Sequence, residues 1–399
     1  MTAVLEGVRV LELGRVPPAE LPGMMLADMG ADVLKIDSPV GSAVARSREQ
    51  ERFEVHSHTN RNKRSMTLNL KTNEGREIFL ALAREADVIV EGFRPGVMER
   101  LGVGYDRVAE LNPRIVYCSL SGFGQAGPDR LRPAHDLNFL ALSGALSLWG
   151  KPGTPPDIPL NLVADYGGAS MHGALAIMFA LFARERSGQG QHIDIAYLDT
   201  TIALMAATPN FRRLFSTAYV PRAGEGVFSG TYPYYTLYET ADRRWLSVAC
   251  SEPPLWQNFC ARLGDPELGR FARQPAHYTR SANAQEAAAR QAVQQLIGMR
   301  SCDEWEHHFA GADVCVAPVR TVPEVLDDLS LRERGLLTDV DHPTQGRVQQ
   351  FASPMRLSKT PSTIRRAAPT TGEHTSQVLS ALGIDAAGIE TLRTNGVVD

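Results

Sequence analysis

The segment 133–139 combines a histidine and an aspartate with the expected start of a helix. Apolar periodicity begins at Leu137, so His135 or Asp136 is expected at the helix N-terminus. The partial positive charge at that position disfavours an imidazolium, which keeps His135 neutral and able to accept a proton. The pattern also fits a plain Asp136 cap with an incidental histidine beside it.

Asp165 is the second candidate, because it stands just before Gly167, Gly168 and a long apolar stretch. We expect its carboxylate at a helix N-cap, where it accepts backbone N–H groups. The two glycines lack a Cβ, so a ligand can approach the backbone, and free N–H groups there suit an oxyanion. An ordinary capping aspartate is the alternative interpretation.

Glu252 is the third candidate and stands between a strand pattern and a helix start at Pro253. This carboxylate lies at the end of a strand in the expected second domain. It also fits a first-turn acid that complements the helix dipole.

Basic residues suggest an anion site in two regions. Arg94 and Arg100 form one region, and the other lies within 46–64. Its members are Arg46, Arg48, Arg52, Arg61, Lys63 and Arg64. Such side chains bind phosphates through charge-assisted hydrogen bonds, although interspersed glutamates also fit a solvated charged face. No Walker A motif and no GxGxxG after a strand is present in the sequence.

Alternating strands and helices must position these residues. Short apolar runs predict strands at 8–13, 32–37, 86–91, 114–119 and 192–196. Helical patterns lie between them, at 21–29, 74–85, 98–101, 108–112 and 167–186. This alternation is typical of an α/β fold with a parallel sheet wrapped by helices.

The remaining chain predicts a second domain, as 399 residues exceed the usual size of one core. The pattern weakens at about 200–235, as in a linker, and 232–251 reads as a hairpin. Helices dominate 254–311, whereas 313–360 is Pro-rich and irregular, and 370–395 carries two short helices.

Bulk properties indicate an ordinary cytoplasmic enzyme. A net charge of -4 gives no general attraction to nucleic acid, and five scattered cysteines are expected to be reduced. No metal-ligand spacing and no signal-like segment is found in the sequence. The longest apolar stretch, 169–183, is too short to span a membrane, so no membrane partner is expected.

Taken in order, the motifs resemble the CaiB/BaiF acyl-CoA family, the family III CoA-transferase fold, from end to end. The matching segments are 5–13, 26–33, 122–128, 188–191, 315–319 and 372–375. Three positions resemble its α-methylacyl-CoA racemase branch. Segment 134–139 resembles the racemase segment whose His, here His135, is a catalytic base, and 161–168 resembles the one bearing the catalytic Asp, here Asp165. Glu252 with Pro253 resembles a pair whose Glu supports that histidine.

The resemblance implies an interlocked homodimer, with the active site between the large domain of one chain and the small domain of the other. The implied parts are a large Rossmann-like CoA-binding domain at 1–200, a linker at 201–230, a small α+β domain at 231–312, a return linker at 313–360, and C-terminal helices at 361–399 that pack back on the large domain. Implied CoA contacts are Leu68, Asn69, Leu70, Lys71, Arg94, Arg100, Ala134, Asp136, Leu137, Asn138 and Phe139. No separate cofactor is implied, because CoA is part of the substrate.

The chain departs from the racemase pattern at three places. Ser38 stands where racemases commonly have Arg, which leaves Lys35 or a residue of 46–64 to contact CoA. The turn 242–244 lacks the usual Gly, and 254–256 replaces a more usual Gln-Phe, which reshapes the expected acyl pocket.

The implied reaction is epimerisation at C2 of a 2-methyl-branched acyl-CoA. His135 would serve one face of C2 and Asp165 the other, with the enolate oxygen held by backbone N–H groups near Asp165 and the glycine pair. The main alternative is a CoA-transferase in which Asp165 is a nucleophile that forms a covalent intermediate. A non-catalytic binder of CoA thioesters is the third possibility.

Overall fold

The computed structural model describes residues 3–14, 17–39, 57–206, 208–343 and 345–399. The chain forms two compact units. Unit 1 contains Met1–Leu140, Leu160–Thr201 and Asp328–Asp399, and unit 2 contains Ala141–Pro159 and Ile202–Asp327. Each unit has its own apolar core, so each is described by itself.

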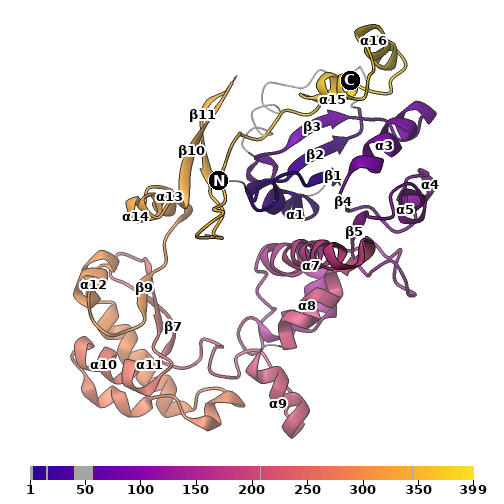
Figure 1. The fold of residues 1–399 in the computed structure, drawn as a ribbon. Coiled ribbons are helices and arrows are strands. Elements are labelled where there is room, and N and C mark those ends of the chain that lie inside the picture. Colours follow the sequence, from indigo (N-terminus) through magenta and orange to yellow (C-terminus); the bar gives the residue numbers. More distant parts are fainter. Residues whose placement is uncertain (1–2, 15–16, 40–56, 207, 344) are drawn as a thin grey trace. The chain divides into compact units, whose positions relative to one another are not determined.

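Unit 1 is built on a six-stranded parallel sheet (Figure 1). Its strands are β1 (Arg9–Leu13), β2 (Asp32–Asp37), β3 (Arg64–Thr67), β4 (Val88–Glu91), β5 (Val116–Ser121) and β6 (Gln191–Ala196). Their order is β3-β2-β1-β4-β5-β6, so the direction of winding reverses between β1 and β4. In such a sheet the crevice outside the carboxyl ends at the reversal is the usual ligand site.

The α/β prediction is confirmed, but the sequence pattern predicted five of these strands and missed β3. This strand is short, lies at the sheet edge and follows the basic cluster. Its residues Ser65, Met66 and Thr67 are nonetheless buried, and Met66 joins the core of unit 1. The sequence pattern did not predict this strand, because a run of four residues beside a charged segment carries little periodicity.

The helices of unit 1 follow the predicted pattern with shifted ends. They are α1 (Pro17–Asp28), η1 (His58–Asn60), α3 (Asn73–Glu85), α4 (Val97–Arg100), α5 (Tyr105–Leu111), α6 (Asp136–Leu142), η3 (Leu162–Ser170), α7 (Met171–Ser187), α15 (Thr375–Ala381) and α16 (Ala386–Thr394). The last residues of α6 fall in unit 2. The two predicted C-terminal helices are α15 and α16, and α15 packs on β3.

One predicted helix has an irregular start. Most of the stretch expected as a helix over 167–186 is α7. Its first residues belong to a π-helix, η3, which begins at Leu162 and passes directly into α7. The whole rod, Leu162–Ser187, spans 26 residues, and by length and composition it is apolar enough to cross a membrane. The expectation of a stretch too short to do so therefore does not hold for the helix as a whole. The signal is weak, because the core helix of a soluble protein passes the same test.

Unit 2 contains a small sheet with helices. Strands β7 (Tyr235–Glu239) and β8 (Trp245–Ala249) form the predicted hairpin, and β9 (Val316–Pro318) pairs with β8. The helices are η2 (Ala145–Leu148), α9 (Pro209–Thr217), α10 (Pro253–Leu263), η4 (Pro266–Phe271), η5 (Pro275–Tyr278), α11 (Ala284–Ile297), α12 (Cys302–Phe309) and α13 (Val322–Leu326). Helix α8 (Tyr197–Ala206) begins in unit 1 and ends in unit 2.

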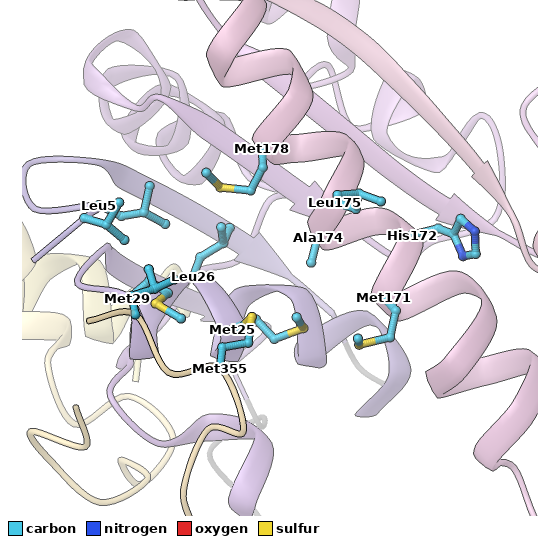
Figure 2. A pocket seen from close by; sticks show the side chains of 12 residues that line it. Leu5, Met25, Leu26, Met29, Met171, His172, Ala174, Leu175, Met178 and Met355 are labelled. Atoms are coloured by element: carbon cyan, nitrogen blue, oxygen red, sulfur yellow. The ribbon is translucent and has the colours of Figure 1, made fainter. Parts of the chain in front are cut away.

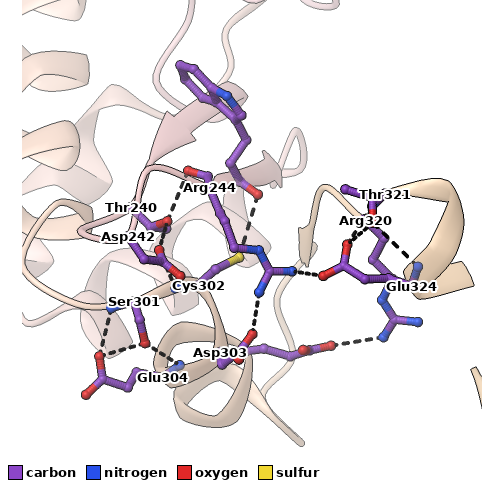
Figure 3. Close-up of polar contacts among 12 residues, drawn as sticks. Thr240, Asp242, Arg244, Ser301, Cys302, Asp303, Glu304, Arg320, Thr321 and Glu324 are labelled. Atoms are coloured by element: carbon purple, nitrogen blue, oxygen red, sulfur yellow. Dashed lines mark hydrogen bonds and ion pairs between the residues drawn. The ribbon is translucent and has the colours of Figure 1, made fainter. Parts of the chain in front are cut away.

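An ion-pair network closes the hairpin turn of unit 2 (Figure 3). The Arg244 guanidinium contacts Asp303 at 2.6 Å and Glu324 at 2.7 Å, which ties the start of β8 to α12 and α13. The turn lacks its usual glycine, and Arg243 takes the left-handed conformation with φ 60° instead. A non-glycine residue adopts this conformation at a cost, so the network stabilises a turn of unfavourable sequence.

Two regions expected to be irregular contain regular structure. Helices α8 and α9 occupy much of 200–235. The return segment 313–360 contains β9, α13, α14 (Leu329–Glu333), and the antiparallel pair β10 (Leu337–His342) and β11 (Gly346–Phe351). Prolines and short elements weaken their periodicity, and the alternation of β10 is interrupted by charged residues.

Candidate active site

His135 stands at the start of α6, as the periodicity predicts. Its backbone N–H donates to the Asn138 Oδ1 atom at 3.0 Å, and its carbonyl accepts from the Asn138 N–H at 2.8 Å. This reciprocal pair fixes the backbone of His135 as a helix cap. The imidazole itself is exposed to solvent and lines a cavity.

Asp136, the next residue, turns the other way. Its side chain is buried, and Oδ2 accepts the backbone N–H groups of Ala164 and Asp165 at 3.0 and 2.9 Å. The carboxylate therefore caps the N-terminus of the π-helix from a position 28 and 29 residues earlier in the chain. It does not line the cavity. The resemblance implied a ligand contact for Asp136, and its side chain is used inside the protein instead.

Asp165 is not the helix cap that the sequence suggested. It lies within the π-helix, and Asp136 occupies the capping role. The amides of Gly167 and Gly168 also lie inside this helix, where each amide donates to the carbonyl five residues earlier. The helix therefore uses the N–H groups that were expected to hold an oxyanion.

The Asp165 carboxyl group is half-buried, with Oδ2 accepting from Asn161 Nδ2 at 3.3 Å. Burial raises its pKa to about 6, and the charge of Asp136 adds to this effect. The Asn161 hydrogen bond and the charge of His135 act in the opposite direction. A carboxyl group with this pKa exchanges its proton close to neutral pH, which suits acid–base chemistry.

A cavity of about 580 Å³ brings His135 and Asp165 together. It lies at the carboxyl ends of the strands, at the reversal between β1 and β4, and is lined by Pro18 after β1 and by 92–95 after β4. Glu91 ends β4 and accepts the Phe93 N–H at 2.8 Å, which fixes the turn that carries Arg94. The cavity therefore occupies the position where α/β sheets bind ligands.

The cavity collects several implied CoA contacts and leaves out others. Ala134, Asn138, Phe139 and Arg94 line it. Leu137 is 40% exposed but does not line it, and neither does Arg100.

Three of the four implied contacts at 68–71 also have a role in the fold. Leu68 and Leu70 belong to the core of unit 1. The Asn69 side chain donates from Nδ2 to the Gly396 carbonyl at 3.1 Å, and its backbone N–H donates to the Val397 carbonyl at 2.8 Å. Lys71 is exposed and outside the cavity. Any ligand contact by this segment is left to its backbone and to the Lys71 side chain.

The described part of the basic cluster is engaged in internal ion pairs. Arg61 contacts Asp28 at 2.6 Å, Lys63 contacts Glu12 at 2.6 Å, and Arg64 contacts Asp32 at 2.6 Å. Lys35, a candidate CoA contact in place of the arginine missing at Ser38, pairs with Glu20 at 3.0 Å and Asp37 at 3.5 Å. Arg46, Arg48 and Arg52 lie outside the described residues.

Glu252 belongs to unit 2, where it is the cap residue of α10. Its Oε2 accepts from the Ser251 hydroxyl at 2.9 Å, and its carbonyl accepts from the Trp256 amide at 3.1 Å. The side chain is exposed, so it remains available for a contact outside its own unit.

Several cavity residues were not singled out from the sequence, and four of them have side chains that can bind a ligand through hydrogen bonds. They are Arg130, Arg132, Asn161 and Tyr197. The two arginines immediately precede the His135 segment, and Tyr197 follows the carboxyl end of β6, so position gave a usable signal for each. Burial and the neighbouring Asp165 charge raise the pKa of Tyr197, which keeps its hydroxyl protonated as a donor.

A second cavity, of about 430 Å³, lies along α1 and α7 (Figure 2). Its wall is apolar and rich in methionine, with Met25 from α1, Met29 from the turn that follows α1, and Met171 and Met178 from α7. The two cavities share no lining residue among those described. Within the described ranges no group of three or more His, Cys, Asp or Glu side chains could hold a metal ion.

The chain is similar to known proteins in both sequence and structure. The family model for CoA-transferase family III matches residues 5–375. An alpha-methylacyl-CoA racemase from Mus musculus is 35% identical, over 99% of this chain and 98% of that relative. A succinate–glutarate CoA-transferase from Agrobacterium fabrum is 33% identical over 95% of each chain. The crystal structure of a CAIB/BAIF family protein from Brucella suis matches with a TM-score of 0.80 at 28% identity, over 96% of this chain and 100% of that chain.

Proposed function

The chain belongs to CoA-transferase family III, and within this family of enzymes we propose that it is an α-methylacyl-CoA racemase. The observation that carries the proposal is that His135 and Asp165 line one cavity at the switch point of the sheet. A racemase needs two acid–base groups around one carbon, whereas a transferase needs only the nucleophilic carboxylate. The similarity to a racemase over nearly the whole chain supports the same choice.

The proposed reaction moves one proton between two faces of C2. One residue of the pair removes the α-proton, the electron pair moves onto the thioester oxygen as an enolate, and the other residue returns a proton to the opposite face. Asp165 has a pKa of about 6, so it can serve as base or acid near neutral pH. Each positioned acid–base group contributes about 10²–10⁴-fold to the rate.

The enolate oxygen requires a hydrogen-bond donor other than the glycine amides. The Asn138 side chain and the Tyr197 hydroxyl both line the cavity and are neutral donors. The Asn138 Oδ1 atom is already used by the His135 amide, which orients the Nδ2 group. We assign the oxyanion to these side chains, where one such donor contributes about 10²–10³-fold.

The CoA moiety is proposed to bind through arginines of the same cavity. Arg94, Arg130 and Arg132 all line it, and Arg132 has Asp129 at 3.9 Å. Guanidinium groups bind phosphate oxygens with charge-assisted hydrogen bonds. This places the anionic part of an acyl-CoA substrate at the cavity and asks for no separate cofactor.

A homodimer is proposed because α7 exposes an apolar face. Leu175, Phe179 and Phe182 are 49%, 65% and 62% exposed, and they follow one another at helical spacing. Contiguous apolar surface of this kind is usually covered by a partner. In the homodimer that the resemblance implies, Glu252 of the partner subunit supports His135, and the exposed position of Glu252 is compatible with this role.

A family III CoA-transferase is the second candidate, favoured by the 33% identity to a succinate–glutarate CoA-transferase. Asp165 would then attack the thioester carbonyl and form an acyl–aspartyl anhydride, with CoA leaving as a thiolate. This role also uses a half-buried carboxylate at the cavity wall.

Proton NMR of a 2-methylacyl-CoA in D2O separates the two candidates. A racemase replaces the C2 proton by deuterium without any added carboxylic acid acceptor. A transferase leaves C2 unchanged and gives a hydroxylamine-sensitive adduct on Asp165. Absence of C2 exchange at high enzyme concentration, together with that adduct, would overturn the racemase proposal.

A further inference from the structure

One carboxylate joins the two candidate catalytic residues. Asp136 follows His135 directly in the chain, and its Oδ2 atom accepts the backbone N–H of Asp165 at 2.9 Å and that of Ala164 at 3.0 Å. The side chain is only 5% exposed. The position of Asp165 relative to His135 is thus set by a buried contact next to the cavity.

The other oxygen of the same carboxylate, Oδ1, is buried and has no hydrogen-bond partner among the described residues. A buried charge with an unsatisfied oxygen is costly. An asparagine would accept the same two amides without the charge, because Asn and Asp cap helices about equally well. The cap therefore does not explain why the residue is acidic.

The charge of Asp136 acts on Asp165. Burial of Asp165 and the Asp136 charge both favour its protonated form, whereas the Asn161 hydrogen bond and the charge of His135 favour the carboxylate. Tyr166 and Tyr197 also lie near Asp165, and their raised pKa values keep them neutral. The guanidinium groups of Arg94, Arg130 and Arg132 face the same cavity.

We propose that Asp136 is a positioning residue that fixes the backbone of Asp165 against His135 and places a buried carboxylate beside the Asp165 carboxyl group. The role deepens the proposed function, on which it rests, because a racemase needs Asp165 as an acid in one direction. Asp136 itself touches neither the cavity nor the substrate.

The variant Asp136→Asn tests the charge alone, since it keeps an oxygen for the two amides. The carboxyl group of Asp165 is followed by ¹³C NMR of aspartate-labelled protein, assigned by difference from Asp165→Asn. We expect its midpoint to move from about 6 toward the 3.8 of an unperturbed aspartate. The acid limb of α-proton exchange should move in the same direction, so the variant keeps more of its maximal rate at pH 5.

The matched control is Asp385→Asn. Asp385 also caps a helix, accepting the Gly388 N–H at 2.8 Å, but it lies at α16. This variant should leave the Asp165 midpoint and the pH profile unchanged. Repeating the Asp136→Asn titration in a His135→Gln background removes any contribution from the neighbouring imidazole.

An Asp165 midpoint that stays at its original value in folded Asp136→Asn would overturn the proposal. If that variant does not fold, Asp136→Ser supplies another neutral capping oxygen and the same readout applies. The titration needs no turnover, so its failure is distinct from failure of the racemase proposal, which is judged by C2 exchange in the unmodified enzyme.

Discussion

The segments 61–64 and 134–139 both carry charged residues expected to touch a ligand, yet they have opposite roles. In the first, Arg61 and Lys63 are buried against Asp28 and Glu12, and Lys63 also donates to the Glu20 carbonyl at 2.9 Å. In the second, His135 and Asn138 line a cavity. The difference lies in pairing: the first set of charges is satisfied inside the protein, and the second keeps groups available to a substrate.

This contrast shows how to separate structural from chemical charge. The Lys63–Glu12 pair is fully buried, and its hydrogen bonds offset part of the cost of removing two charges from water; burial still raises the pKa of Glu12 to about 7. Asp165 is only half-buried and has one weak hydrogen bond, at 3.3 Å, to Asn161. A group left with free hydrogen-bonding capacity at a cavity wall is the one to test for catalysis.

The largest expected effect is a loss of catalytic rate when His135 or Asp165, which line the cavity, is replaced. His135→Ala should slow the loss of α-deuterium from one enantiomer of a 2-methylacyl-CoA by about 10²–10⁴-fold, and from the other far less, because Asp165 still serves its face. Asp165→Asn should show the reverse preference. Exchange is followed by NMR for each pure enantiomer. Equal residual exchange from both enantiomers would contradict the two-base assignment.

On the structural side, Lys63→Met should destabilise the protein by about 3–5 kcal/mol, since it leaves the Glu12 carboxylate buried without its partner. Urea unfolding measures the loss. The double variant Glu12→Leu with Lys63→Met removes both charges and should recover most of it. A double variant no more stable than the single one would show that the ion pair is not the reason for the loss.

The next effect contrasts Arg94, which has no ion-pair partner in the described part of the chain, with a paired arginine. Arg94→Ala should raise the KM for the CoA thioester about 10- to 100-fold, because a hydrogen bond to a charged group contributes about 1.5–3 kcal/mol. Arg64 is bonded to Asp32 by two hydrogen bonds of 2.9 and 2.6 Å, so Arg64→Ala should leave KM unchanged. A rise in KM for Arg64→Ala and none for Arg94→Ala would reverse the assignment.

The sequence predicted elements that depend on adjacent residues, but it could not predict contacts between residues far apart in the chain. The bounds of β2 were predicted to the residue, because its apolar residues Val33, Leu34 and Ile36 come directly after Gly30, which closes the preceding helix. The cap on the π-helix comes from Asp136, far earlier in the chain, so no local pattern could distinguish it from a cap by Asp165 itself. The pairing of Lys63 with Glu12 likewise joins residues far apart in the chain, one just before β3 and the other on β1, and the sequence alone showed only a run of basic residues.

The smallest expected effect is a pH dependence set by Asp165. In either direction of racemisation, one group of the Asp165–His135 pair carries a proton and the other does not. The active pair therefore holds one proton for both enantiomers, and both should show the same pH profile. Below about pH 6 the Asp165 carboxylate gains a proton and can no longer act as base. The kcat/KM value should then fall about tenfold per pH unit. Lys63 does not line the cavity, so folded Lys63→Met should keep the same acid limb of the kcat/KM profile. A shift of that limb in Lys63→Met would show that the buried Lys63–Glu12 pair influences Asp165, contrary to the comparison.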